Sequence, residues 1–133
     1  IIILASIIER EAVNADERSI IAGIFHNRLK SRDTSLRKLQ SCATIQYIYY
    51  MKEGIIKEKI FTEDTKINHP YNTYQTEGLP PGPICNPGED AIKAALFPEE
   101  TDFLYFVARG DGTHEFSRTY NEHQAAMRKY GVR

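Results

Sequence analysis

The segment from Tyr71 to Gly88, YNTYQTEGLPPGPICNPG, constrains the fold of this 133-residue chain more than any other. Its prolines and glycines leave no helical or strand period, which predicts one long irregular loop. A loop of this length is uncommon in a compact domain unless it has a function. Its Asn, Tyr and Thr side chains suit hydrogen bonding to a hydroxyl-rich ligand, and its prolines would hold them in place before binding.

Helical patterns precede this loop. Apolar residues at helical spacing predict a buried helix over 1–13 and a second helix that begins at Asn14, where Glu17 completes a capping box. A polar loop is expected over 31–35, followed by a third helix over 43–52. The first half of the chain is therefore predicted to be helical.

The region after the loop mixes helix and strand. Asn86 is the expected N-cap of a helix over 89–96, with a proline at the first helical position. Aromatic and apolar residues over 103–108 and 113–117 flank a Gly-Asp-Gly turn and predict a β-hairpin. Thr119, with Glu three residues later, predicts the cap of a last helix. Together these elements predict an α+β fold, a helix-rich single domain with one hairpin and a long Pro-rich loop.

Composition narrows the classes of function. Hydrophobic residues make up 41% and charged residues 26% of the chain, as in ordinary globular domains. Seventeen basic and eighteen acidic residues give a net charge of −1, which offers no electrostatic case for binding nucleic acid. The histidines form no compact metal motif, so no metal and no other cofactor is expected. Cys42 and Cys85 fit either two thiols or one disulfide.

Glu9 is the first candidate for chemistry. It follows Ile7 and Ile8 on the first expected helix. A carboxyl group beside apolar surface loses hydration of its charged form, which favours the protonated form and allows proton donation at neutral pH. The alternative is that Glu9, like Glu11, only marks the polar edge of an amphipathic helix.

A second carboxyl group would complete an ordinary glycosidase site, and no partner stands out. Glu77 and Glu115 are candidates, whereas Asp111 lies between two glycines and is most simply a turn residue. His114 follows that turn and shares a strand face with Phe116. It is either a residue of the site or a hairpin residue paired across the strand.

Several segments, taken in order, resemble the endolytic murein transglycosylase (YceG-like) family. They are LASIIEREA, FHNRL, LQSCATIQY, PYNTYQTEGLPPGPICNPG, AIKAAL, LYFVARGDGTHEFS and TYNEH. They cover nearly all of residues 1–133, and the PYNTY…GLPPGPI…NPG run is the most specific. The resemblance implies that these residues form a catalytic domain, preceded in the full-length protein by a membrane anchor and a small LysM-like module. The domain would then lie on the extracytoplasmic side of the cytoplasmic membrane.

The resemblance also implies an activity. Such enzymes cut the glycan strands of peptidoglycan internally, between N-acetylmuramic acid and N-acetylglucosamine, and leave 1,6-anhydro ends. The implied role is to terminate or trim nascent strands, with cell-wall synthases as possible partners. The catalytic Glu of the family's SI-[IV]-E-x-E segment falls on Glu9. Glu9 would protonate the departing oxygen and then take a proton from the C6 hydroxyl that attacks C1, so no second carboxyl is needed.

Further residues of the motif segments are implied as sugar and peptide contacts or as loop supports. They are Asn27, Arg28, Gln40, Ser41, Thr44, Gln46, Tyr71, Asn72, Thr73, Tyr74 and Asn86, and His114 of the hairpin joins them. Asn27 and Arg28 are placed to orient Glu9 from the neighbouring helix, and a surface ion pair is the alternative for Arg28. Asn86 has the alternative of serving only as a helix cap.

Two positions depart from the family, and two other activities stay open. Cys42-Ala43 stands where the family often has Asp-Pro, and a disulfide from Cys42 to Cys85 joining the motif loops is a hypothesis. The first alternative activity is a hydrolytic, muramidase-like glycosidase that uses water and a second carboxylate such as Glu77 or Glu115. The second is a non-catalytic domain that binds or scaffolds peptidoglycan.

Overall fold

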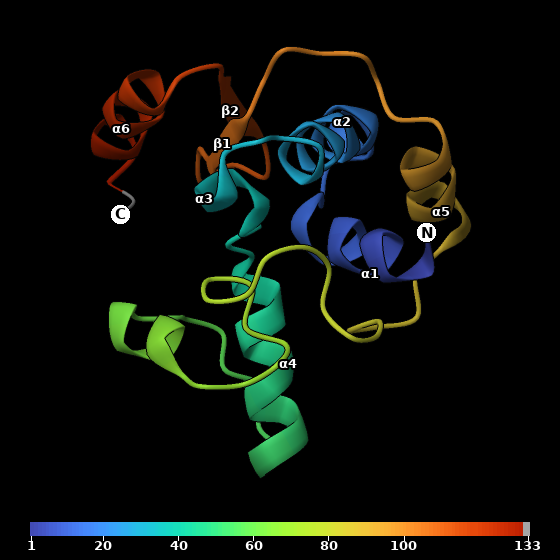
Figure 1. Ribbon diagram of the computed structural model, residues 1–133, viewed down its shortest axis with the longest axis vertical. Coiled ribbons are helices and arrows are strands. Elements are labelled where there is room, and N and C mark those ends of the chain that lie inside the picture. Colours follow the sequence, from blue (N-terminus) through green and yellow to red (C-terminus); the bar gives the residue numbers. More distant parts are fainter. Residues whose placement is uncertain (132–133) are drawn as a thin grey trace.

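Helix α1 (Ile2–Glu11) packs against three other helices in the computed structural model, which describes residues 1–131 (Figure 1). These are α2 (Arg18–Leu29), α4 (Cys42–Glu53) and α5 (Glu89–Leu96). Leu4, Ile7 and Ile8 are buried on α1, as expected for a helix that is apolar almost all round. The central position of α1 places its polar C-terminal turn among the other elements.

Six further elements complete the described part of the domain. They are η1 (Ala15–Glu17), α3 (Thr34–Arg37), η2 (Thr62–Lys66), the strands β1 (Tyr105–Ala108) and β2 (His114–Ser117), and α6 (Tyr120–Lys129). The strands pair antiparallel, with Ala108 opposite His114 and Phe106 opposite Phe116. Figure 1 shows the hairpin and α6 on one side of α1 and α2, with α5 on the other.

The hydrophobic core joins α1 and α2 to the hairpin. Phe25 of α2 is fully buried, and its ring meets Phe106 of β1 edge-on at 5.7 Å between centroids. Such T-shaped aromatic pairs add about 0.5–1.5 kcal/mol beyond the burial of their surface. The hairpin is thereby held against the helices next to the last turn of α1.

The structure confirms the α+β fold class, the single hairpin and the irregular loop. Residues 71–88 contain turns and bends but no helix or strand. Thr119 and Glu122 form the expected reciprocal capping box at the start of α6. These signals were local, and the sequence therefore predicted them well.

Three local predictions were wrong. The Asn14 side chain accepts a hydrogen bond from the Asp16 N–H and caps η1, whereas Glu17 bonds to a residue of the hairpin. Helix α5 begins at Glu89 with Gly88 as its N-cap, so Asn86 does not cap it. The expected polar loop over 31–35 contains the start of α3, which the Asp33 side chain caps.

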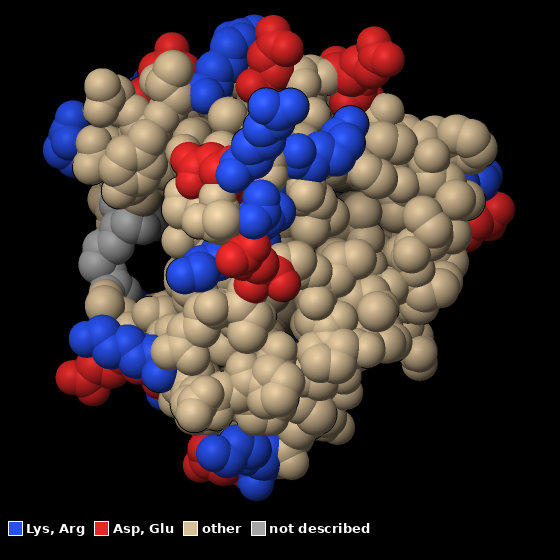
Figure 2. All heavy atoms as spheres, in the orientation of Figure 1, with Lys and Arg blue, Asp and Glu red and all other residues tan. Residues whose placement is uncertain are grey.

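Charges are mixed on the face shown in Figure 2. Lys and Arg residues alternate there with Asp and Glu residues on one side, and a broad area on the other side is largely uncharged. No helix within residues 1–131 has the length and apolar character needed to cross a membrane.

Candidate active site

Glu9 lies on the last turn of α1, next to the end of the long loop. Its Oε1 accepts a hydrogen bond of 2.7 Å from the Gly88 N–H, and within residues 1–131 its Oε2 accepts none. A Cβ at position 88 would lie 3.0 Å from Oε1, so glycine allows this close backbone approach. The carboxyl group is half-buried, with one oxygen held by the Gly88 N–H and the other open.

Two residues later, Glu11 meets a different environment. Successive helical residues are ~100° apart, which turns Glu11 about 200° away from Glu9. Burial raises the pKa of Glu11, while His114, the Ser41 hydroxyl, the Ala43 N–H and Arg10 each lower it. Ser41 Oγ is buried and makes no hydrogen bond of normal geometry within the described residues. Sequence reasoning treated Glu11 as a polar edge and missed this environment, because no local signal shows what lies across from a helix.

Glu17 and His114 form a buried pair beside Glu11. Glu17 Oε2 accepts a hydrogen bond of 3.0 Å from the His114 N–H, and Glu17 Oε1 lies 2.9 Å from His114 Nδ1. The two side chains are 13% and 10% exposed. The His114 ring also meets Phe106 edge-on at 5.4 Å. His114 is therefore both a cross-strand hairpin residue and a residue of this polar cluster.

The long loop supplies more of the predicted site residues than any other segment, and buried side chains of the loop itself hold it in place. Asn72 and Thr73 are fully buried. Asn72 donates to the carbonyls of Thr65 and Ile67, and its Oδ1 accepts from the Tyr74 N–H. Thr73 Oγ1 accepts from the Ser41 N–H at 2.9 Å.

Thr44 belongs to the same buried set. Its hydroxyl lies 2.9 Å from that of Thr73 and donates to the Ser41 carbonyl. In this structure Ser41, Thr44 and Thr73 join the loop to the start of α4. Asn72 joins the loop to η2 and the residue after it. Their role as ligand contacts stays a prediction.

Asn27 and Arg28 also bind backbone. Asn27 donates to the carbonyls of Thr101 and Phe103. Arg28 donates from its three nitrogens to the carbonyls of Leu36, Lys38 and Leu104. It forms no ion pair within residues 1–131, and burial lowers its pKa. Both side chains position the hairpin and the α3 segment rather than touching Glu9.

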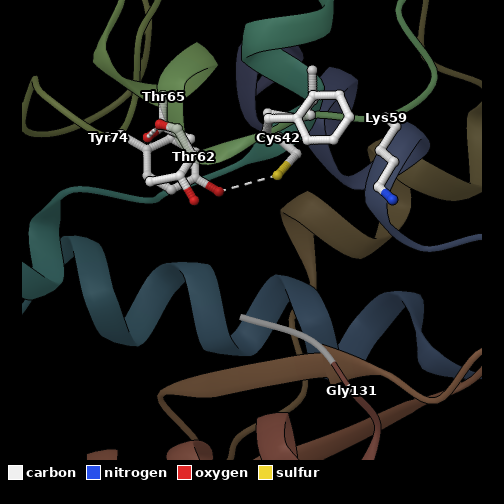
Figure 3. Close-up of a pocket in the computed structure, with 8 residues that line it drawn as sticks. Cys42, Lys59, Thr62, Thr65, Tyr74 and Gly131 are labelled. Atoms are coloured by element: carbon white, nitrogen blue, oxygen red, sulfur yellow. Dashed lines mark hydrogen bonds between the residues drawn. The ribbon is translucent and has the colours of Figure 1, made fainter.

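Gln40, Gln46 and Tyr74 are predicted residues that are at least partly exposed. Gln40 is exposed and adopts φ of 55°, a conformation that non-glycine residues rarely take and that functional sites often retain. Gln46 Oε1 accepts from Arg10 at 2.8 Å, and its amide donates to the Lys57 carbonyl. Tyr74 Oη lies 3.0 Å from Cys42 Sγ, and Figure 3 shows the two groups pointing toward each other.

Tyr71 and Asn86 differ in their surroundings. The Tyr71 ring lies 5.4 Å from that of Tyr47, and its hydroxyl is against Gly82, where a Cβ would come within 2.6 Å. Tyr71 therefore packs the loop onto α4. Asn86 is exposed just before Gly88.

The proposed disulfide between Cys42 and Cys85 is wrong. Both residues are thiols in the structure. Cys85 Sγ donates to the Ser6 carbonyl at 3.3 Å. Burial and the nearby Glu9 carboxylate raise the pKa of the Cys85 thiol.

Three hollows adjoin through shared residues. The Tyr47 hollow, of about 370 Å³, is lined by Arg10, Gln46, Tyr47, Tyr50, Ile56 and Ile84. The hairpin cavity, of about 500 Å³, is lined among others by Arg10, Glu11, Gln40, Tyr74, Tyr105 and His114.

The Cys42 hollow, of about 650 Å³, includes Cys42, Lys59, Phe61 and Tyr74 (Figure 3). Arg10 separates the first two hollows, and Cys42 with Tyr74 separates the last two. Glu9 precedes Arg10 on α1 but is not among the residues that line these three hollows.

Comparisons with known proteins agree with this architecture. The model of the YceG-like family matches residues 1–129. An endolytic murein transglycosylase of Bacillus subtilis is 42% identical over 127 residues, which are 96% of this chain and 33% of that protein. One from Streptococcus pneumoniae is 40% identical over 79% of this chain and 18% of its own length. The crystal structure of a yceG-like protein from Listeria monocytogenes has 42% identity and a TM-score of 0.80, covering 92% of this chain and 38% of that one. The chain thus spans a third or less of the curated relatives it matches.

Proposed function

Because the chain belongs to the YceG-like family, we propose that it is the catalytic domain of a lytic transglycosylase that cleaves the glycan strands of peptidoglycan internally. Two relatives at 40–42% identity carry the name endolytic murein transglycosylase. The proposed cut lies between N-acetylmuramic acid and N-acetylglucosamine and leaves 1,6-anhydro ends, so that the enzyme terminates or trims nascent strands.

The observation that carries this proposal is the asymmetric setting of Glu9. The Gly88 N–H holds Oε1 at 2.7 Å, and Oε2 has no hydrogen-bond partner within residues 1–131. A held carboxyl group with one open oxygen can give a proton to a departing glycosidic oxygen and then accept one. An intramolecular C6 hydroxyl supplies the nucleophile, and the mechanism requires neither a water nor a second carboxylate.

The surroundings of the other candidate carboxylates disfavour hydrolysis. Glu77 forms an ion pair with Arg37 at 2.8 Å. Glu115 accepts a hydrogen bond of 2.9 Å from the Tyr130 hydroxyl. Each is engaged with a partner other than Glu9, whereas an inverting or retaining pair would have its two carboxyl groups about 5–9.5 Å apart across one bond.

The three adjoining hollows support an internal cut. Neighbouring hollows share Arg10 at one border and Cys42 with Tyr74 at the other. An enzyme that cuts inside a strand must hold sugars on both sides of the scissile bond. Three neighbouring hollows suit a polymer better than a single closed pocket does, although Glu9 itself lines none of them.

Other parts of the proposal rest on the family alone. We propose that the full-length protein is anchored in the cytoplasmic membrane, with this domain on the extracytoplasmic side, and that cell-wall synthases are partners. Fractionation of cells, combined with protease accessibility of the domain in spheroplasts, tests the placement. Domain recovered in the soluble cytoplasmic fraction would contradict it.

The test of the activity is mass spectrometry of glycan strands treated with the intact protein or with Glu9→Gln. Loss of a positioned general acid costs about 10²–10⁴-fold in rate, so the variant should yield almost no new ends. Products from the unsubstituted protein should carry 1,6-anhydro-muramic termini. Reducing ends would instead identify a hydrolase, and unchanged cleavage by Glu9→Gln would remove Glu9 from the mechanism.

A further inference from the structure

Helix α6 is held to the rest of the domain by little buried surface. It packs against the hairpin strands β1 and β2, and Ala126 is the one residue of Tyr120–Lys129 that is buried. Figure 1 shows α6 beside the hairpin at the edge of the molecule. Elements with few buried apolar contacts open locally at low cost in free energy. Helix α6 can therefore leave the hairpin while the helical core stays folded.

Helix α6 also forms one wall of the hairpin cavity. Tyr120, His123 and Met127 line this cavity of about 500 Å³ from α6, and Tyr105 lines it from β1. Movement of α6 away from the hairpin would remove this wall and widen the entrance to the cavity. The helix therefore occupies the position of a lid.

The ring of His123 joins this lid to the hairpin. Its imidazole is stacked on the Tyr105 ring, with 4.8 Å between centroids and 19° between planes. Tyr120 adds a tilted contact with the same ring at 5.9 Å. His123 Nδ1 is buried and has no hydrogen-bond partner within residues 1–131. Protonation makes both ring nitrogens donors, so it would leave a buried N–H and its share of a positive charge unpaired.

A fixed positive charge lies close to the stacked rings. The Arg28 guanidinium is 5.4 Å from the centre of the Tyr105 ring. Three backbone carbonyls hold it there, and the Asp33 carboxylate favours its charge without forming an ion pair with it. Burial and Arg28 both lower the pKa of His123. A protonated His123 would be a second cation beside a ring that Arg28 already covers.

The carboxylates around α6 are engaged with other groups. In β2, Glu115 accepts a hydrogen bond from the Tyr130 hydroxyl and lies 3.9 Å from Lys129 Nζ. On α6, Glu122 accepts hydrogen bonds from two backbone N–H groups at the start of its own helix.

The remaining titratable groups of the cavity face other partners. His114 of β2 is paired with Glu17, and Glu11 of α1 lies beside His114. Within the described residues, the charge that acts on His123 is therefore that of Arg28.

We propose that α6 is a pH-sensitive lid on the hairpin cavity, which is closed while His123 is neutral and opens when His123 is protonated. The closed form binds the proton less well than the open form does. Closure therefore weakens as pH falls from about 6.5, the ordinary pKa of histidine, through the lower pKa of the closed form. The inference concerns access to the cavity and holds whatever ligand enters it.

The test uses two methionines as reporters, since hydrogen peroxide converts an accessible thioether to the sulfoxide. Met127 lines the cavity from α6, whereas Met51 of α4 is 43% exposed. Peptide mass spectrometry gives the oxidation rate of Met127 relative to Met51 in the intact protein at about pH 7.5 and about pH 5. We expect this ratio to rise about threefold to tenfold at the lower pH. A ratio that does not change with pH overturns the proposal.

Two variants show whether His123 is the titrating group. His123→Phe keeps a ring that can stack on Tyr105 but cannot be protonated, so its oxidation ratio should be the same at both pH values. His69→Gln is the matched control, because it removes a histidine of the long loop whose Nδ1 accepts from the Tyr71 N–H. It should keep the pH response of the parent. A pH response retained by His123→Phe would overturn the proposal.

Hydrogen–deuterium exchange separates opening of the lid from unfolding of the domain. At about pH 5, after correction for the intrinsic exchange rate, peptides from α6 should lose protection while those from α1 and α2 keep it. Equal loss in all three helices would mean acid unfolding and would reject a lid. If His123→Phe does not fold, an NMR titration of the His123 ring in the parent decides. Its midpoint should lie below about 6.5 and coincide with the loss of protection in α6, and a midpoint at or above that value overturns the proposal.

Discussion

Glu9 and Glu11 stand two residues apart on the same helical turn and have opposite surroundings. On the loop side of α1, Glu9 accepts a 2.7 Å hydrogen bond from the Gly88 N–H and leaves one oxygen open. On the hairpin side, Glu11 lies beside His114 and Ser41, and burial raises its pKa. The helical period separates the two carboxyl groups, so one short E-x-E motif places them in two different environments. The distant segment that faces each Glu determines its environment.

On the loop side, Gly88→Ala tests the close approach that holds the Glu9 carboxyl group, and it should lower the rate of strand cleavage. Its φ of −76° suits alanine, but the new Cβ would lie 3.0 Å from Glu9 Oε1. The carboxyl group must then give way by a few tenths of an ångström. Because a misplacement of about 1 Å costs about 10²-fold in rate, we expect kcat for strand cleavage to fall by a smaller factor, about threefold to tenfold. Thermal stability should change by less than about 1 kcal/mol. Initial rates of strand cleavage measure kcat, and thermal unfolding of the intact protein measures stability.

The matched control is Lys93→Ala, an exposed change on the same helix. It should leave both quantities near those of the parent. If Gly88→Ala cleaves at the parental rate, the hydrogen bond to Glu9 does not matter for the reaction, and the contrast between the two sides of α1 loses its functional meaning.

The contrast also shows how far the sequence could predict the molecule. Local signals predicted α1, the hairpin and the cap of α6, since their patterns lie within a few residues. Glu17 was misread because its partner, His114, is 97 positions away, and the buried histidine N–H takes the carboxylate that the helix start would otherwise use. Asn72 and Thr73 were expected as ligand contacts or as loop supports; both are fully buried, and their side chains hydrogen-bond to backbone groups that hold the loop, which the sequence pattern alone could not distinguish.

On the hairpin side, Glu11→Gln should change the pH dependence of stability. Burial raises the pKa of Glu11 above its ordinary value of 4.5 in the folded protein. The protonated folded state is therefore favoured at low pH, and this stabilisation is lost as pH rises from about 4.5 through the folded pKa. Gln does not ionise, so the variant should match the parent below about pH 4 and gain stability relative to it toward pH 7. Urea unfolding at several pH values measures the difference.

The equivalent substitution at Glu9 should not reproduce that gain, because Glu9 is half-buried and its Oε1 accepts a hydrogen bond from the Gly88 N–H. If the change in stability caused by Glu11→Gln is constant over pH 4–7, or has the opposite sign, the surroundings on the hairpin side do not destabilise the charged form of Glu11. The two carboxyl groups would then differ in position alone.

The smallest expected effect uses Cys85 as a reporter of charge on the loop side. Burial raises the pKa of this thiol, and the Glu9 carboxylate raises it further. Since the thiolate is the reactive form, Glu9→Gln should increase the rate at which iodoacetamide alkylates Cys85 at pH 8. Mass spectrometry of peptides follows Cys85 separately from Cys42. Glu11→Gln should leave the rate unchanged, because Glu11 acts on the hairpin side; equal acceleration by both variants would show that α1 does not insulate its two carboxyl groups from each other.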